Sequence, residues 1–405
     1  MMAASSKVGA HDAERGAPVG ELLFRPQALH NHGSCVVELS DGSLLACWYR
    51  GSGERTADDV GIMGARQRAG SRRWSRPFVM ADTPGYPDVN PCMALDSRGR
   101  LWLFWITVLD NRWESSLLKY RVSDRPTRRG GAPRWAANDV LHLKPGPEFT
   151  EVVRRDLPRQ WQPYIEKASV SERAELQRYV EERLVAAEDK LRVRLGWMTR
   201  PHPVQLPSGR FLLPLYSDGF DFSLMAYTDD GGRTWTVSNP IVGPGNVQPS
   251  VVRRIDGTLV AYFRDNGPPP QRVMVSESKD EGVTWSLARD TDLPDPGAGL
   301  EVIALRSGLW VLINNDTERG RHRLALTISE DEGRNWRLAR RLEDDPPGPD
   351  AGSYAYPSIL QASDGTLHAT YTYRPNRRAA TRYGAGESIK HVRFGEEWLR
   401  AGAVT

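Results

Sequence analysis

The chain has 405 residues, of which 39% are hydrophobic and 26% are charged, a composition too apolar for a disordered protein. Its 54 basic and 51 acidic residues leave a net charge of +3, which is too small to indicate nucleic acid or a membrane surface as the partner. Thirteen Trp, thirteen Tyr, 37 Gly and 29 Pro favour many short strands joined by turns and exclude an all-helical bundle.

The chain begins with residues 1–20, which we expect to be a disordered tail because they include small and charged residues without an apolar run. A secretory signal would need such a run, and the longest one in the chain, Leu101 to Leu109, is shorter than the roughly 18 residues of a membrane helix. Cys35, Cys47 and Cys92 each lie within apolar segments, which is typical of buried thiols in a reducing compartment. Because no metal-ligand spacing is present either, we predict a cytoplasmic protein without a metal or cofactor.

Six hairpin signals follow along the chain, each an apolar strand, a short turn ending in Gly, and a second apolar strand. The turns lie at residues 41–42, 97–99, 208–209, 256–257, 307–308 and 364–365. Counted from positions 41, 98, 208, 256, 307 and 364, they are separated by 57, 110, 48, 51 and 57 residues. This spacing predicts an all-β fold, a six-bladed β-propeller with four strands in each blade, over residues 21–405 as one domain. A two-sheet sandwich would not produce six evenly spaced hairpins.

The interval of 110 residues contains a predicted helical insertion over residues 149–195, between blades 2 and 3. Leu176, Val180 and Leu184 recur at helical spacing after a capping box formed by Ser169 and Glu172. The insertion either packs over the rim of the propeller as a lid or docks a partner, and a homo-oligomer is left open.

An eight-residue motif occurs three times in the second half of the chain, at residues 228–235, 278–285 and 329–336. Each copy begins with Ser or Thr, carries Asp at its third position and Gly at its fifth, and ends in Trp. The pattern predicts a hairpin turn in which Asp binds backbone groups and Trp packs beneath. We therefore interpret the three aspartates as structural: Asp230, Asp280 and Asp331.

Polar residues occupy the strand ends that a propeller brings together near its axis. The start of each first strand and the end of each second strand lie on one rim, so residues equidistant from the six turns converge. Eight or nine residues before the turns are His32, Asn90, Arg200, Gln248, Gly299 and Tyr356. Eight to ten residues after the turns are Arg50, Thr107, Ser217, Arg264, Asp265, Asn315, Tyr373 and Arg374. Together they predict a polar cup with several arginines, suited to an anionic sugar or another carboxylate ligand.

Two loops near the same rim add charged candidates. A glycine-flanked acidic loop contains Glu54, Asp58 and Asp59, where a general acid is expected. Arg321, in a basic segment eight residues before the third repeat of the turn motif, lies at the start of an inward-facing strand.

The turn motifs and hairpins resemble those of the sialidase (neuraminidase) superfamily, in particular its bacterial neuraminidase-repeat, or Asp-box, branch of exo-α-sialidases. The resemblance covers about Phe24 to Trp398. The segments that carry it are Trp48–Glu54, Asp58–Val60, Asn90–Pro91, Leu213–Asp218, Gln248–Ser250, Phe263–Asp265, Leu293–Gly297, Tyr356–Ser358 and Ile389–His391.

The resemblance implies roles for particular residues. Tyr356 matches the nucleophile, Asp59 the acid/base residue, and Arg264 and Arg321 two of the three arginines that bind the substrate carboxylate. Two positions depart from the family pattern. Gln248 stands where sialidases have the Glu that activates Tyr, and His32 stands where they have the first arginine.

The sequence therefore predicts a sialidase-like glycosidase acting on an acidic sugar or glycan, with an atypical site in which Gln248 orients Tyr356. One alternative is an elimination or rearrangement in the same cup, with His32 and Tyr356 as base and acid. Another is a non-catalytic propeller that binds a glycan or small acid, an interpretation that Gln248 favours. In each case we expect the protein to bind a small molecule or glycan, and we expect it to bind neither nucleic acid nor a membrane.

Overall fold

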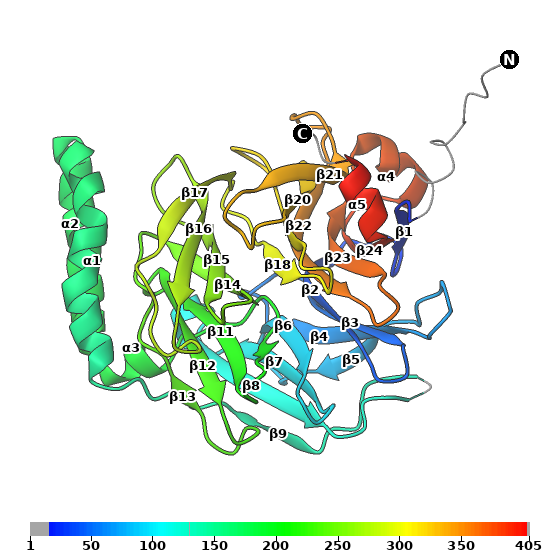
Figure 1. Ribbon diagram of the computed structural model, residues 1–405, viewed down its shortest axis with the longest axis horizontal. Helices are drawn as coiled ribbons and strands as arrows, with labels where there is room; N and C mark the ends of the chain where they lie inside the picture. The colour runs from blue at the N-terminus through cyan, green and yellow to red at the C-terminus, as the bar shows by residue number, and fades with distance from the viewer. Residues whose placement is uncertain (1–15, 129, 403–405) are drawn as a thin grey trace, which may run out of the picture.

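Six antiparallel four-stranded sheets surround a common axis in the computed structural model, which describes residues 16–128 and 130–402 (Figure 1). The predicted all-β six-bladed propeller is thereby confirmed. Blade 1 contains β2 (His30–Glu38), β3 (Leu44–Gly51), β4 (Gly61–Gln67) and β5 (Phe78–Ala81). Blade 2 contains β6 (Asp88–Leu95), β7 (Leu101–Val108), β8 (Ser116–Ser123) and β9 (Ala137–Val140). Blade 3 contains β10 (Val204–Gln205), β11 (Phe211–Ser217), β12 (Phe222–Thr228) and β13 (Thr236–Val237).

The second half of the chain continues the same pattern. Blade 4 contains β14 (Asn246–Arg253), β15 (Leu259–Asp265), β16 (Arg272–Ser278) and β17 (Arg289–Pro294). Blade 5 contains β18 (Glu301–Ala304), β19 (Trp310–Asn314), β20 (Arg323–Ser329) and β21 (Arg337–Asp344). Blade 6 contains β22 (Ser353–Gln361), β23 (Leu367–Arg374), β24 (Ser388–Phe394) and β1 (Val19–Leu22).

The six predicted turns join the first and second strands of the six blades. In each, the Gly N–H donates to the carbonyl three residues earlier, as Gly42 does to Leu39 and Gly365 to Ala362, both within 3.0 Å. The glycines have φ between 73° and 96°, a region that side chains disfavour, so the sequence marks these turns clearly.

The ring is closed by strand β1, which pairs antiparallel with β24 and places Val19 opposite Arg393. The expected disordered tail ended at residue 20, but β1 already begins at Val19 because its backbone completes the sheet of blade 6. Residues 1–15 of that tail lie outside the described residues. Short helices α4 (Arg377–Tyr383) and α5 (Glu396–Gly402) flank β24, and a 3-10 helix, Trp113–Ser115, precedes β8.

The helical insertion lies between blades 2 and 3, as predicted, and consists of α1 (Glu148–Lys167), α2 (Val170–Ala186) and α3 (Lys190–Arg194). Ser169 and Glu172 form the expected capping box at the start of α2. Figure 1 shows the α1–α2 hairpin at the outer edge of the molecule beside blades 3 and 4, away from the axis. Phe149 anchors α1 by packing against Phe220 and Phe222 of blade 3. The insertion is therefore not a lid across the axis.

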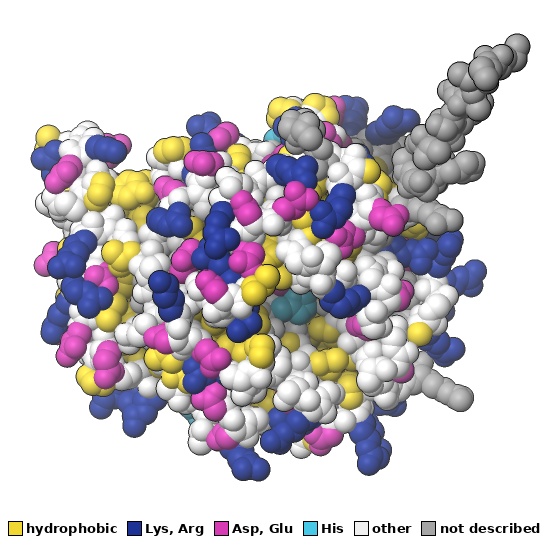
Figure 2. Space-filling model, in the orientation of Figure 1, with side chains coloured by type: hydrophobic (Ala, Val, Ile, Leu, Met, Phe, Trp, Pro, Cys, Tyr) yellow, Lys and Arg dark blue, Asp and Glu magenta, His cyan; other side chains and the backbone are white. Residues whose placement is uncertain are grey.

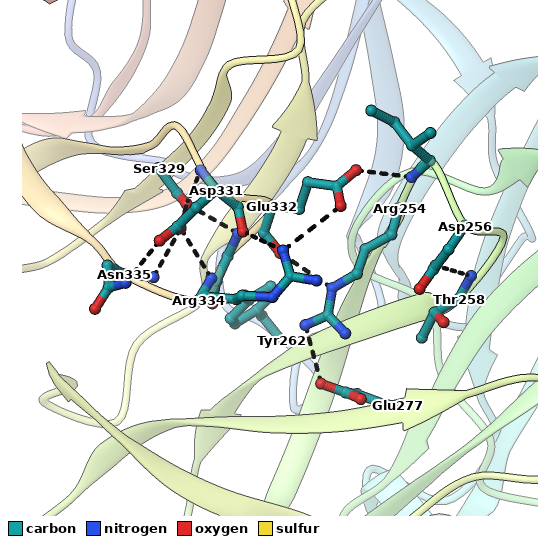
Figure 3. Close-up of polar contacts among 12 residues, drawn as sticks. Arg254, Asp256, Thr258, Tyr262, Glu277, Ser329, Asp331, Glu332, Arg334 and Asn335 are labelled. Atoms are coloured by element: carbon teal, nitrogen blue, oxygen red, sulfur yellow. Dashed lines mark hydrogen bonds and ion pairs between the residues drawn. The ribbon is translucent and has the colours of Figure 1, made fainter.

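The three repeated turn motifs are structural, as predicted. In the third, Asp331 accepts hydrogen bonds from the Ser329 hydroxyl at 2.7 Å and from the Asn335 backbone N–H at 2.8 Å (Figure 3). These hydrogen bonds outweigh the effect of burial and lower the pKa of Asp331 to about 2. Arg254 of blade 4 donates to the carbonyl of Glu332 in the same turn, at 3.1 Å, so the motif also joins neighbouring blades.

A buried polar layer crosses the axis of the ring. His202 Nδ1 lies 2.7 Å from Glu301 Oε1, and His202 Nε2 lies 2.8 Å from the Val36 carbonyl and 3.2 Å from Cys35 Sγ. Since both ring nitrogens face acceptors, this histidine fits the imidazolium form. Although burial opposes it, the charges of Cys35 and Glu301 raise the pKa of His202 well above its usual value. Cys35 is buried and reduced, as are the other two cysteines.

Basic and acidic side chains are interspersed over the face drawn in Figure 2, and a histidine lies in a hollow near the middle of that view. None of the described helices is both long and apolar enough to cross a membrane.

Candidate functional site

A cavity of about 470 Å³ at the axis is lined by side chains from all six blades. Eight predicted site residues line it: His32, Glu54, Asn90, Gln248, Arg264, Arg321, Tyr356 and Arg374. Nine residues that were not predicted as site residues complete the lining: His30, Trp113, Tyr216, Asp218, Asn266, Ser353, Ala355, Thr372 and Glu387. The predicted polar cup with arginines is thus present in the structure.

Bulges in the innermost strands direct side chains into the cavity. Asn90, Gln248 and Tyr356 each precede a proline, and each Xaa-Pro pair lies opposite a single residue of the neighbouring strand. The three residues have φ of 51°, 55° and 50°, which is strained for residues other than Gly. Proline suits such a bulge because it has no N–H for the ladder. These three residues occupy equivalent bulges and all line the cavity, so the strained backbone here serves to place their side chains.

Tyr356 lies at the centre of this arrangement. Its hydroxyl oxygen accepts hydrogen bonds from Arg264 Nη1 at 3.0 Å and from Gln248 Nε2 at 3.3 Å. The guanidinium of Arg321 lies 5.3 Å from the centre of its ring. Gly299 leaves room for the ring, because a Cβ there would lie 2.6 Å from Tyr356 Cδ1. Two donors on one phenol oxygen stabilise negative charge on that atom.

Gln248 connects Tyr356 with a second tyrosine. Its Nε2 also donates to the Tyr216 hydroxyl at 3.2 Å, and Asn90 Nδ2 donates to the same oxygen at 3.1 Å. Burial raises the pKa of Tyr216 well above its usual value, so this phenol stays protonated. Gln248 acts here as a hydrogen-bond donor and has no carboxylate with which to take a proton.

Arg264 and Arg321 carry charges that no carboxylate neutralises. Neither makes an ion pair with an acidic side chain in the described part of the chain, and Arg264 Nε is buried without a hydrogen-bond partner. Arg321 makes one long hydrogen bond to the Gly297 carbonyl, at 3.4 Å. Half-buried guanidinium groups without counterions favour an anionic ligand in the cavity.

His32 is neutral at physiological pH. Burial and the charges of His30, Arg321, Arg200 and Arg264 lower its pKa well below 6.5. The side chain makes no hydrogen bond within the described residues, and its ring meets that of Tyr356 edge-on with centroids 4.3 Å apart. A neutral imidazole next to a phenol can accept a proton.

Glu387 lines the cavity next to His30. It accepts from Arg374 Nη2 at 2.6 Å and lies 2.8 Å from His30 Nδ1. Against the effect of burial, the contact with His30 lowers the pKa of Glu387 to about 2. Arg374 is therefore neutralised within the protein, unlike Arg264 and Arg321.

Asp218 is the carboxyl group of the cavity whose ionisation is most perturbed. Burial, followed by the charge of Asp221, raises the pKa of Asp218 to about 7. Near neutral pH this side chain carries a proton for much of the time, as a general acid requires.

Six predicted site residues lie outside the cavity lining: Asp59, Arg50, Arg200, Asp265, Asn315 and Tyr373. Successive residues of a strand point to opposite faces, so Arg264 faces the cavity and Asp265 does not, and Arg374 faces it and Tyr373 does not. Asp265 accepts from the Gly267 N–H at 2.6 Å instead.

The other residues outside the lining have identifiable positions. Asp59 is exposed and accepts from the Ser52 N–H and hydroxyl at 2.9 and 2.8 Å. Arg200 is buried behind Tyr356 and donates to the Pro357 carbonyl at 2.8 Å. Asn315 donates to the Tyr354 carbonyl at 2.8 Å, and Arg50 lies at the end of β3.

Among the residues that sequence reasoning missed, His30 had a visible signal, because it lies two positions before His32 and faces the same way. Tyr216 faces the cavity where the spacing favoured its neighbour Ser217. Trp113 and Asp218 lie in connections between strands, where no periodicity indicates the direction of a side chain.

Comparisons with known proteins agree with this architecture. The family model described as "BNR repeat-like domain" matches residues 42–160 and 178–369. No curated protein matches the chain. The NanB sialidase of Streptococcus pneumoniae superposes with a TM-score of 0.65 at 13% identity, over 94% of this chain and 71% of that one. A protein of unknown function from Dyadobacter fermentans superposes with a TM-score of 0.64 at 13% identity, and the match covers 94% of this chain and 98% of that one. The intramolecular trans-sialidase of Ruminococcus gnavus superposes with a TM-score of 0.64 at 13% identity, and the match covers 93% of this chain and 97% of that one. At these identities the likeness establishes the fold.

Proposed function

The chain belongs to the BNR repeat-like family and has the sialidase fold, and from this premise we propose that it cleaves a glycosidic bond of an acidic sugar or glycan in the axial cavity. The observation that carries the proposal is the pair Arg264 and Arg321. Both line the cavity beside Tyr356, and neither is neutralised by a carboxylate of the described residues. A sugar carboxylate supplies the missing counterion.

Tyr356 is the proposed nucleophile. A substrate whose carboxylate is held by Arg264 and Arg321 places its anomeric carbon near the Tyr356 oxygen. Negative charge on this oxygen is stabilised by donors from Arg264 and Gln248. In this interpretation Arg264 replaces, by its positive charge, the activation that a Glu at position 248 would provide. Sialidases and intramolecular trans-sialidases among the structural neighbours support a reaction on such sugars.

Elimination or rearrangement within the same cavity is a second candidate, and the state of His32 favours it. A neutral imidazole without a hydrogen-bond partner, in ring contact with Tyr356, is available to take a proton from a carbon next to a carboxylate. Hydrolysis would release the sugar with one added water, whereas elimination would release an unsaturated product.

The test uses a panel of acidic sugars and their glycosides, with thermal shift for binding and product analysis by mass spectrometry. Wild type is compared with Arg264→Ala, Tyr356→Phe and the control Arg178→Ala, which changes an exposed arginine on α2. We expect Arg264→Ala to reduce the shift strongly and Tyr356→Phe to retain it while losing turnover by at least about 10²-fold. Binding without any product from wild type would instead identify a non-catalytic propeller.

A further inference from the structure

Asp218 lies directly after β11 and lines the same cavity as Tyr356, with its carboxyl group half-buried. No hydrogen bond or ion pair engages its carboxyl oxygens in the described part of the chain. It is thus a carboxyl group in the cavity that no protein contact uses, two residues after Tyr216 of the hydrogen-bond network around Tyr356.

The surroundings of Asp218 favour its protonated form. Asp221, Glu114 and Glu54 approach it from three segments, and Arg264 is the positive group that faces it. Glu114 packs next to Gly219, where an added Cβ would lie 2.9 Å from Glu114 Cγ. Because three acidic side chains converge on a half-buried carboxyl group, placing a fourth negative charge there is costly.

Asp59, the acid/base residue that the family resemblance implied, has the opposite environment. It lies outside the cavity lining, and hydrogen bonds from the Ser52 N–H and hydroxyl lower its pKa. A carboxylate held in this way is a poor proton donor near neutral pH.

We infer that Asp218 is the catalytic residue that protonates the leaving oxygen when the glycosidic bond breaks. This inference rests on the proposed hydrolysis and adds the proton donor to it. The Asp218 proton passes to the glycosidic oxygen, which keeps the electron pair of the breaking bond and leaves as an alcohol. Tyr356 gives its hydroxyl proton to solvent before this step, and its oxygen, which accepts from Arg264 and Gln248, then bonds to the anomeric carbon.

The second half of the reaction returns both groups to their initial states. The Asp218 carboxylate takes a proton from a water molecule whose oxygen bonds to the anomeric carbon. The bond from that carbon to Tyr356 breaks, and its electron pair returns to the phenolate oxygen. One water is consumed for each glycosidic bond, and no oxidant or other co-reactant is needed.

Leaving-group dependence tests this assignment. The substrates are two series of glycosides of the sugar that the panel identifies. In one series the leaving group is an acidic phenol, and in the other it is an alkyl alcohol or a second sugar. Asp218→Asn should lose roughly 10²–10⁴-fold in kcat/KM with the poor leaving groups, which need protonation, and far less with the acidic phenols. In wild type, kcat/KM should fall as pH rises above about 7, because Asp218 loses its proton. With aryl substrates this fall should be absent in Asp218→Asn.

Two comparisons separate the outcomes. Asp59→Asn represents the rival assignment, and Asp229→Asn, which changes an exposed carboxylate paired with Arg210, is the matched control. The inference is wrong if Asp218→Asn loses the same factor in kcat/KM on both series. It is also wrong if the loss depends on the leaving group in Asp59→Asn instead. In either case the hydrolase proposal stands. If wild type turns over no member of either series, the proposed function fails and the inference fails with it. Ligand-induced thermal shifts of Asp218→Asn verify that the variant still folds and binds.

Discussion

Replacing Asp218 by Asn should stabilise the folded protein at alkaline pH and leave its stability at acidic pH nearly unchanged. In the unfolded chain this carboxyl group ionises near pH 4, whereas burial and the neighbouring Asp221 raise the pKa of Asp218 to about 7 in the fold. Between these values the unfolded state has lost the proton and the folded state has kept it. The free energy of unfolding of wild type therefore falls as pH rises from about 4 to about 7.

The magnitude follows from the size of the shift. About three pKa units correspond to about 4 kcal/mol at 1.36 kcal/mol per unit. Because the side chain is half-buried and solvent screens its charge, we expect about 2–4 kcal/mol. At roughly 2.1 cal/mol/K for each of the 405 residues, this is a difference of roughly 2–5 °C in Tm.

The assay is thermal unfolding of wild type and Asp218→Asn at intervals from pH 4.5 to 8.5. Burial also raises the pKa of Asp265 to about 7 and that of Asp295 to about 6, so both proteins lose stability over this interval. The quantity to examine is therefore the difference between the two curves, which should be near zero at pH 4.5 and largest above pH 7. A difference that does not change with pH would refute the proposed environment of Asp218.

Three further predictions concern the cavity and the layer beneath it. Arg264→Ala should weaken binding of an anionic sugar by roughly 10- to 100-fold, the loss of about 1.5–3 kcal/mol from charged hydrogen bonds; a titration that shows unchanged affinity would contradict it. Gly299→Ala places a Cβ 2.6 Å from Tyr356 Cδ1, so turnover should fall by roughly 10²-fold in steady-state kinetics while circular dichroism stays unchanged. His202→Phe leaves Glu301 buried without its ion-pair partner, so the free energy of unfolding measured in urea should fall by about 3 kcal/mol. If the variant is as stable as wild type, the pair contributes nothing.

The fold was predictable because its signals are local and repeated. Each of the six turns needs a glycine with positive φ, and each turn motif needs an Asp that binds its own backbone, so the sequence records both directly. The helical insertion was visible for the same reason, through the capping box at Ser169. The start of β1 was missed because its pairing with β24 spans nearly the whole chain and leaves no local pattern.

The site was predictable only where strands position it. Counting residues from the turns located Asn90, Gln248 and Tyr356, because the bulges occur at equivalent places in their blades. Counting failed at strand ends, where a shift of one residue exchanges the two faces, as at Arg264 and Asp265. It also failed in the loops that carry Trp113, Asp218 and Asp59, since loop paths depend on contacts between blades that no spacing expresses.

The pairing of β1 with β24 also determines when the ring can close. Strand β1 is synthesised before the other described strands, and its partner, Ser388–Phe394, is synthesised after them. Until then the N-terminal strand has no sheet to join, and its backbone N–H and carbonyl groups lie open to pairing with other chains. The order of synthesis thus makes closure of blade 6 a late folding step, and a nascent chain that stops before β24 carries β1 as an unpaired strand.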